Sequence, residues 1–102
     1  MSDKKETVSI EIRNHFGRYA EDKDRAKKIR DEKILPALAE DKSLIIDFED
    51  IVSAPHSLLN AMLATPIERL GLAAYKKIKI INAAPEIRET LDFIFDDNTS
   101  NA

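Results

Sequence analysis

The sequence contains no cysteine and no tryptophan, and it has only two glycines and two histidines. Without cysteine the chain can form no disulfide, no reactive thiolate and no cysteine-ligated zinc site. Gly17 and Gly71 are too few to build a phosphate-cradling loop or a dinucleotide-binding fingerprint. His15 and His56 are far apart in the chain and belong to no HExxH motif. We therefore expect neither a metal site nor any other bound cofactor.

Long apolar runs are also missing. No run approaches the roughly 18 residues that a membrane-spanning helix needs, so we expect no membrane association. Residues 1–6 are polar and charged, without the apolar core of a signal peptide. They predict a flexible N-terminus and a cytoplasmic protein.

Excess positive charge is absent too, since the net charge is −3 over 102 residues. Proteins that bind nucleic acid mainly neutralise phosphates with lysine and arginine, so this balance predicts no nucleic-acid partner. The basic stretch from Lys23 to Lys33 is interspersed with acidic residues and has no aromatic side chain to stack on bases. It is typical of a solvated helix face that carries weak ion pairs.

Apolar spacing predicts an α/β fold in one domain, residues 7–95, followed by a flexible acidic tail, residues 96–102. We expect about four strands in a mixed sheet and three to four helices. The strand from residue 8 to 12 and the strand from Ser43 flank a helix, so they should be parallel. In chain order the expected elements are a strand at 8–12, a short strand within 14–19, a helix at 22–39 disturbed by Pro36, a strand from 43, a helix from 54 or 55, a strand at 77–82 and a helix from Pro85.

The second helix carries conflicting signals near its end. Ser53 is expected to cap its start. Thr65, Pro66 and Glu68 match a capping box, which predicts that this helix breaks and that a new short helix begins. Gly71 is expected to close that short helix in a left-handed conformation.

The stretch from Ser43 to Thr65 is the strand, loop and helix around which we expect the domain to be organised. Residues 44–48 are almost entirely apolar and suit a strand buried on both faces. Function in open α/β sheets collects where strands lead into helices, which directs attention to residues 50–57. Asp47 interrupts the strand, and we expect its carboxylate to be satisfied by a neighbouring backbone or first-turn donor.

Several local strings resemble those of the STAS-like domains, which are distant relatives of the bacterial anti-sigma-factor antagonists. The strings are GRY at Gly17–Tyr19, LPAL at Leu35–Leu38, IDFEDI at Ile46–Ile51 and KIKIINAAPEIR at Lys77–Arg88. Their order and spacing extend the resemblance from Phe16 to Phe95.

The resemblance implies a regulatory domain without catalytic activity that docks on a protein partner. In the antagonists this partner is an ATP-binding, histidine-kinase-like protein that phosphorylates a serine at the start of the helix after the Asp-containing strand. The equivalent position falls at His56 or Ser57, within Pro-His-Ser instead of the antagonists' Asp-Ser-Ser; Leu58 follows, where the STAS-like group commonly has phenylalanine. The implied candidates for partner binding or a phosphorylation switch are Asp50, Ser53, His56, Ser57 and Asn60.

Phosphate on Ser57 would place extra negative charge near Glu49 and Asp50 and weaken binding to an acidic or apolar partner surface. The competing interpretation is that Ser57 only bonds a first-turn carbonyl or N–H.

Two other functions stay open. A small enzyme could use Asp47 or Asp50 with His56 for acid/base chemistry. A dyad of His56 and Ser57 fails, because adjacent helical residues point about 100° apart. Alternatively, residues 72–75 could form a patch for a regulatory partner or for a second copy. The sequence leaves the partner's identity and the oligomeric state open.

Overall fold

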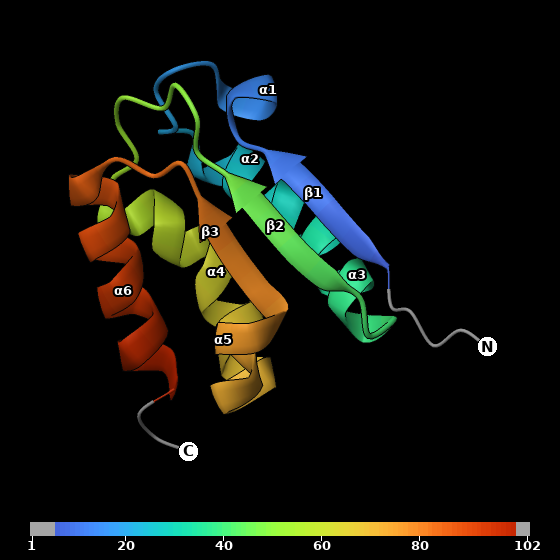
Figure 1. Ribbon diagram of the computed structural model, residues 1–102. Helices are drawn as coiled ribbons and strands as arrows, with labels where there is room; N and C mark the ends of the chain where they lie inside the picture. The colour runs from blue at the N-terminus through green and yellow to red at the C-terminus, as the bar shows by residue number, and fades with distance from the viewer. Residues whose placement is uncertain (1–5, 100–102) are drawn as a thin grey trace.

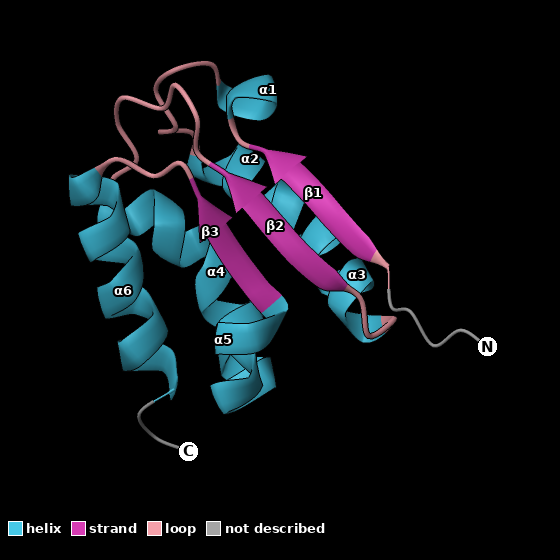
Figure 2. Cartoon of the chain, viewed as in Figure 1, coloured by secondary structure: helices cyan, strands magenta, loops and turns pink. Residues whose placement is uncertain are grey.

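The computed structural model describes residues 6–99 (Figure 1). Strands, helices and the loops that join them are distinguished in Figure 2. In chain order the elements are β1 (Thr7–Glu11), α1 (Arg13–Phe16), α2 (Lys23–Ile29), the π-helical turn η1 (Arg30–Ile34), α3 (Leu35–Ala39), β2 (Ser43–Asp47), α4 (His56–Leu70), the 3₁₀ turn η2 (Gly71–Ala73), α5 (Ala74–Lys77), β3 (Ile78–Ile81) and α6 (Pro85–Thr99).

The sheet has the order β1-β2-β3, and both strand pairs are parallel. Ser9 lies opposite Ile45, which lies opposite Lys79. The expected parallel pairing of the first strand with the Ser43 strand is therefore confirmed, as is the α/β class. Within residues 6–99 the sheet has three strands, so the expected mixed sheet of about four is wrong.

The missing strand was expected within residues 14–19. Residues from Arg13 instead form α1, because the N–H groups of His15 and Phe16 donate locally to the carbonyl of Ile12. Gly17 then turns the chain with a φ of 72°. Tyr19 alone retains a strand-like contact, an isolated parallel bridge to Ser53 in the loop after β2.

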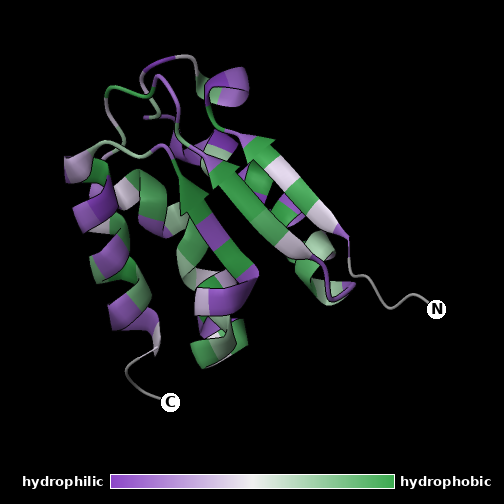
Figure 3. Ribbon diagram, viewed as in Figure 1, coloured by the Kyte–Doolittle hydropathy of each residue, from purple (hydrophilic) through white to green (hydrophobic). Residues whose placement is uncertain are grey.

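The sheet is covered by helices on one side, which is the far side in Figure 1. Alternate side chains of β1 and β2, such as Ile10, Leu44 and Ile46, are buried against these helices. On the open face Ser9 and Lys79 are exposed, and Ile45 is only half-buried. The prediction that the Ser43 strand is buried on both faces is therefore wrong. Figure 3 shows how strongly apolar β2 is even so, as expected of a central strand.

The first helical run begins at α2, where the carboxylate of Asp22 accepts hydrogen bonds from the N–H groups of Asp24 and Arg25 (3.1 and 3.2 Å). Pro36 lies in the first turn of α3, where a missing N–H costs least. The π-helical turn η1 carries the chain into that turn, with the N–H of Leu35 donating to the carbonyl of Arg30. The expected disturbance at Pro36 is confirmed.

The second run does not break where we expected. Helix α4 continues through Thr65 and Pro66 to Leu70, so the predicted capping box is wrong. Pro66 is buried, as are Met62 and Ile67 of the same helix, and this burial offsets the backbone hydrogen bond that proline cannot make. Gly71 has the predicted positive φ, 63°, but it ends the continuous α4 and not the separate short helix that we expected.

The final helix, α6, begins at Pro85 as predicted and packs along α4. It continues to Thr99, so the predicted boundary after Phe95 is wrong. Phe95 and Thr99 are both buried, and the Thr99 hydroxyl donates to the Phe95 carbonyl (2.8 Å). The expected tail at 100–102 and the expected flexible residues 1–5 lie outside the described residues. Three helical runs and the short α1 agree with the expected three to four helices.

The buried side chains form one continuous core between the sheet and the helices. No helix within residues 6–99 is both long enough and apolar enough to cross a membrane. The core residues are Ile10, Ile12, Ala20, Ala26, Ile29, Ile34, Ala37, Leu44, Ile46, Phe48, Ile51, Ala54, Leu58, Leu59, Met62, Leu63, Ile67, Ala74, Ile78, Ile87, Leu91, Ile94 and Phe95.

Candidate partner-binding site

The loop between β2 and α4 lies at the carboxyl end of the sheet, against residues 17–21 (Figure 2). The N–H of Val52 donates to the carbonyl of Arg18, and the N–H of Ala20 donates to the carbonyl of Ser53, both at 2.8 Å. Ile51 and Ala54, on either side of this contact, are buried in the core. Backbone hydrogen bonds to residues 17–21 and the buried side chains of Ile51 and Ala54 thus hold the loop in place.

Two of the predicted site residues fasten this loop. The carboxylate of Asp50 lies 2.5 Å from the guanidinium of Arg13, and both side chains are about half exposed. Asp50 also adopts a φ of 63°, which aspartate tolerates better than most residues. The hydroxyl of Ser53 donates to the carboxylate of Glu21 (3.2 Å), so it does not cap α4 as predicted; Pro55 occupies that position without a side-chain cap.

Asp47 has the structural role that we expected. Its Oδ1 accepts hydrogen bonds from the N–H of Glu49 (2.9 Å) and from the side-chain amide of Asn82 (3.0 Å). Asn82 follows β3, and its φ of 58° turns the chain there. The Asp47 carboxylate therefore ties the ends of two neighbouring strands together.

The remaining three predicted residues share the start of α4 and are all exposed. His56 and Ser57 are in the first turn, and Asn60 is one turn further on the same side. The ring of His56 packs on the ring of Phe93 from α6, with 5.8 Å between their centroids. Within residues 6–99 the hydroxyl of Ser57 has no hydrogen-bond partner, so the local bond considered for it is not formed.

Exposed apolar side chains lie around these polar residues. Tyr19, Val52 and Phe93 are between 58% and 59% exposed. Sequence reasoning did not select any of them. A signal was present for Phe93, because it falls off the stripe of Ile87, Leu91 and Ile94 that buries α6.

The residues considered for acid/base chemistry are separated. Asp47 contacts Asn82, Asp50 contacts Arg13 and His56 contacts Phe93, so the three form no hydrogen-bonded pair with one another in the described part of the chain. Within residues 6–99 no group of three or more histidines and carboxylates could hold a metal ion. Within residues 6–99 these three side chains therefore do not assemble an acid/base pair.

The alternative patch at residues 72–75 is at the other end of α4. Leu72 is 67% exposed, whereas Ala74 is buried. The hydroxyl of Tyr75 donates to the carboxylate of Asp96 (2.6 Å), and this hydrogen bond raises the pKa of Tyr75. Ala74 of this patch therefore belongs to the core, and Tyr75 is hydrogen-bonded to α6.

The family comparison identifies the fold family of this chain. A family model described as a STAS-like domain of unknown function matches residues 25–88, which is more than half of the chain and includes the loop and α4. No curated protein and no solved structure matches the chain significantly. The chain belongs to the family of STAS-like domains of unknown function.

Proposed function

We propose that this domain is a non-catalytic regulatory module that docks on a cytoplasmic protein partner through the β2–α4 loop and the start of α4. We call this surface the docking face and define it by Val52, His56, Ser57, Asn60 and Phe93. The observation that carries the proposal is the exposure of Val52 and Phe93 around polar side chains on a loop that hydrogen bonds hold in place. Exposed apolar side chains on a rigid frame favour binding of another protein.

Ser57 is the candidate switch of this face. Its hydroxyl is exposed, lacks a partner within residues 6–99 and lies in the first turn of α4. A phosphate there would be tolerated by the helix, because the N-terminal end of a helix favours negative charge. Its main effect would be to add about −1.5 to −2 charges next to His56, whose ring packs on Phe93, which opposes burial of this surface by a partner. The proposed partner is an ATP-binding, histidine-kinase-like protein.

The test is capture of partners from lysate with ATP, using the wild-type chain and four variants. Val52→Asp and Phe93→Ser alter the apolar part of the docking face, and Ser57→Asp mimics phosphate. Leu72→Ser is the matched control, because Leu72 is also an exposed apolar residue, at 67%, and lies beyond the opposite end of α4. Mass spectrometry identifies captured proteins and measures phosphate on Ser57.

We expect an ATP-binding protein to be captured by the wild type and by Leu72→Ser, and to be lost with the other three variants. Capture that survives Val52→Asp and Phe93→Ser would show that the docking face is elsewhere. A third outcome separates the two parts of the proposal. If capture is lost with Val52→Asp and Phe93→Ser but unchanged with Ser57→Asp, and Ser57 carries no phosphate, the docking face is supported and the Ser57 switch is rejected.

A further inference from the structure

The basic stretch from Lys23 to Lys33 lines a small depression of about 140 Å³ in the surface. The residues that line it are His15 of α1, Arg25, Lys28 and Ile29 of α2, and Glu32 and Lys33 of η1. Arg25, Ile29 and Lys33 follow one another at four-residue spacing, so the helical run presents them on one side. Ile29 is buried in the core, and the charged side chains form the rim around it.

Neighbouring carboxylates do not neutralise the cations of this depression. Arg25 has one long ion pair, 3.9 Å to the exposed Asp22. Within residues 6–99, Lys28 and Lys33 make no ion pair, and neither does Glu32. The expectation of weak ion pairs along this stretch therefore does not extend to these side chains. Three cations share the depression with one carboxylate, and the excess positive charge favours an anion there.

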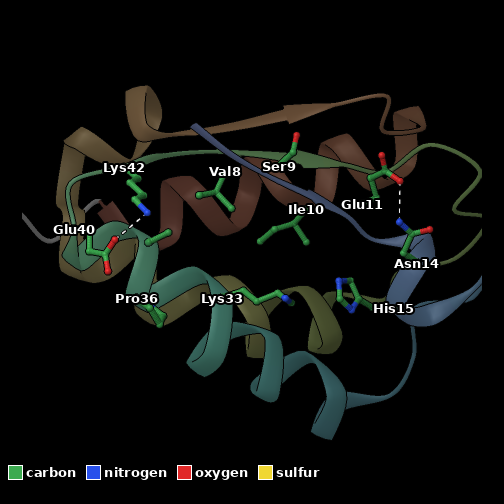
Figure 4. Close-up of a pocket in the computed structure, with 11 residues that line it drawn as sticks. Val8, Ser9, Ile10, Glu11, Asn14, His15, Lys33, Pro36, Glu40 and Lys42 are labelled. Carbon is green, nitrogen blue, oxygen red and sulfur yellow. Dashed lines mark hydrogen bonds and ion pairs between the residues drawn. The ribbon is translucent and has the colours of Figure 1, made fainter. Parts of the chain in front are cut away.

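His15 lies within reach of this excess charge. Figure 4 shows the side chain of Lys33 extending toward the ring of His15. Burial of the ring, followed by repulsion from Lys33 and Arg25, lowers the pKa of His15 below its usual 6.5. The repulsion means that the electrostatic potential at the ring is positive, although Glu32 lines the same depression.

The charged groups on the other side of His15 already have partners. There the ring lines a larger groove, of about 510 Å³, along the free edge of β1 (Figure 4). The carboxylate of Glu11 accepts a hydrogen bond from the side-chain amide of Asn14, and Glu40 is ion-paired with Lys42, both at 2.9 Å. These two carboxylates therefore do not neutralise the cations beside His15.

We propose that the depression binds a tetrahedral oxyanion, such as a phosphate group, through Arg25, Lys28 and Lys33, with His15 as an additional N–H donor. Arginine and lysine are the side chains that proteins commonly use to bind phosphate. The depression is smaller than the roughly 300–1,000 Å³ of pockets that enclose drug-sized ligands, so it suits a single ionic group. A bound dianion favours the protonated form of His15, so the anion and the proton should bind cooperatively.

The first test is a proton NMR titration of the His15 ring in sulfate, up to about 50 mM, and in sodium chloride of the same ionic strength, because salt alone screens repulsion. Sulfate is the probe because it keeps both charges over the pH range in which histidine titrates. We expect sulfate to raise the pKa of His15 by about 0.5 or more above its value in chloride, which corresponds to about threefold tighter binding to the protonated ring. Equal pKa values in the two salts would overturn the proposal.

The second test asks whether the cations of the depression hold the anion. Lys28→Gln removes one of them. Lys27→Gln is the matched control, because Lys27 is exposed on the same helix but does not line the depression. We expect the sulfate-dependent rise in the pKa of His15 to fall by about half or more in Lys28→Gln and to stay unchanged in Lys27→Gln. An equal rise in both variants would show that no site is formed by these side chains.

A phosphate group could come from a free ion or from a nucleotide, and a third measurement distinguishes these sources. Amide chemical shifts of residues 15–33 report the binding of inorganic phosphate and of AMP at the same pH and ionic strength. Tighter binding of AMP would support a site for a nucleotide phosphate, and equal dissociation constants would support a site for the free ion. None of these results bears on the docking face, because no residue of α1, α2 or η1 belongs to it.

Discussion

At the scale of single residues, His15 lies among cationic side chains. Its ring is half-buried and lies in a shallow depression lined by Arg25, Lys28, Glu32 and Lys33. Burial, followed by repulsion from Lys33 and Arg25, lowers the pKa of His15 from its usual 6.5. The folded protein therefore disfavours the charged form of this ring.

This environment predicts a loss of stability in mild acid. Near pH 6.5 and below, His15 of the unfolded chain takes up a proton that the folded chain resists, so the free energy of unfolding falls as the pH falls through this window. The ring is only partly buried, which limits the effect to less than about 1 kcal/mol. Urea unfolding of the wild type and His15→Gln at pH 7.5 and 5.5 measures it, and we expect a smaller pH dependence for the variant.

The comparison with His15→Gln isolates the histidine, because every carboxylate titrates in both proteins. Lys33→Gln is a second check. Removing that charge should bring the pKa of His15 back toward 6.5, which a proton NMR titration of the ring reports. Equal pH dependence in the wild type and His15→Gln would show that the ring protonates as readily in the folded chain as in the unfolded one.

At the scale of elements, the sequence predicts the three strands that form, but it also predicts a strand within 14–19 that does not form, and it misplaces several helix boundaries. Val8, Ile10 and Ile12 alternate, and residues 44–46 are continuously apolar, so local pattern alone identifies β1 and β2. Pro66 shows the limit of such signals. Its position after Thr65 predicts a helix start, but burial of its ring within the core keeps α4 continuous. That burial depends on tertiary packing, which local pattern does not contain.

Gly71 is an element boundary that both sequence and structure assign, and it yields a quantitative prediction. Its φ of 63° and ψ of −140° lie outside the regions open to residues with a Cβ atom. A Cβ added there would meet no atom within 4 Å. The strain in an alanine variant would therefore come from the backbone conformation and not from contact with neighbouring residues. Gly71→Ala should lower the free energy of unfolding by about 1–2 kcal/mol, measured by urea denaturation.

Leu72→Ala is the matched control for Gly71→Ala. Leu72 is 67% exposed and follows directly, and its truncation should change stability by less than about 0.5 kcal/mol. If Gly71→Ala were as stable as the control, the boundary between α4 and η2 would have to relax to a negative φ. The orientation of η2 and α5 relative to α4 would then be adjustable and not fixed by this glycine.

At the scale of the whole molecule, the sequence predicts where the candidate site lies along the chain but not what its side chains contact. The carboxyl end of β2 is where open α/β sheets concentrate function, and the candidates His56, Ser57 and Asn60 are exposed at the start of the helix that follows it. Asp50 and Ser53 were assigned to the site, but they bond Arg13 and Glu21 from a distant part of the chain. Local sequence cannot reveal such long-range partners, nor that His56 meets Phe93.

The extent of the folded unit gives the last prediction. The family match covers residues 25–88, so it starts within α2 and stops within α6. A fragment with those ends lacks all of β1 and the buried Leu91, Ile94 and Phe95 of α6. Its central strand would lose a neighbour and α4 would lose the helix that covers it. Each large core side chain removed costs roughly 2–5 kcal/mol, against a total stability of about 5–15 kcal/mol for a domain.

We therefore expect residues 25–88 alone to be unfolded and residues 6–99 to fold cooperatively. Amide dispersion in two-dimensional NMR spectra, together with a sigmoidal urea transition, distinguishes the two states. Residues 6–99 are the matched control, because that fragment contains every described strand and helix. A dispersed spectrum from residues 25–88 would mean that β2, β3 and α4 form a core by themselves. In that case β1 and most of α6 would be additions to a smaller domain, and the free β1 edge would be a feature of this chain and not of the family's common core.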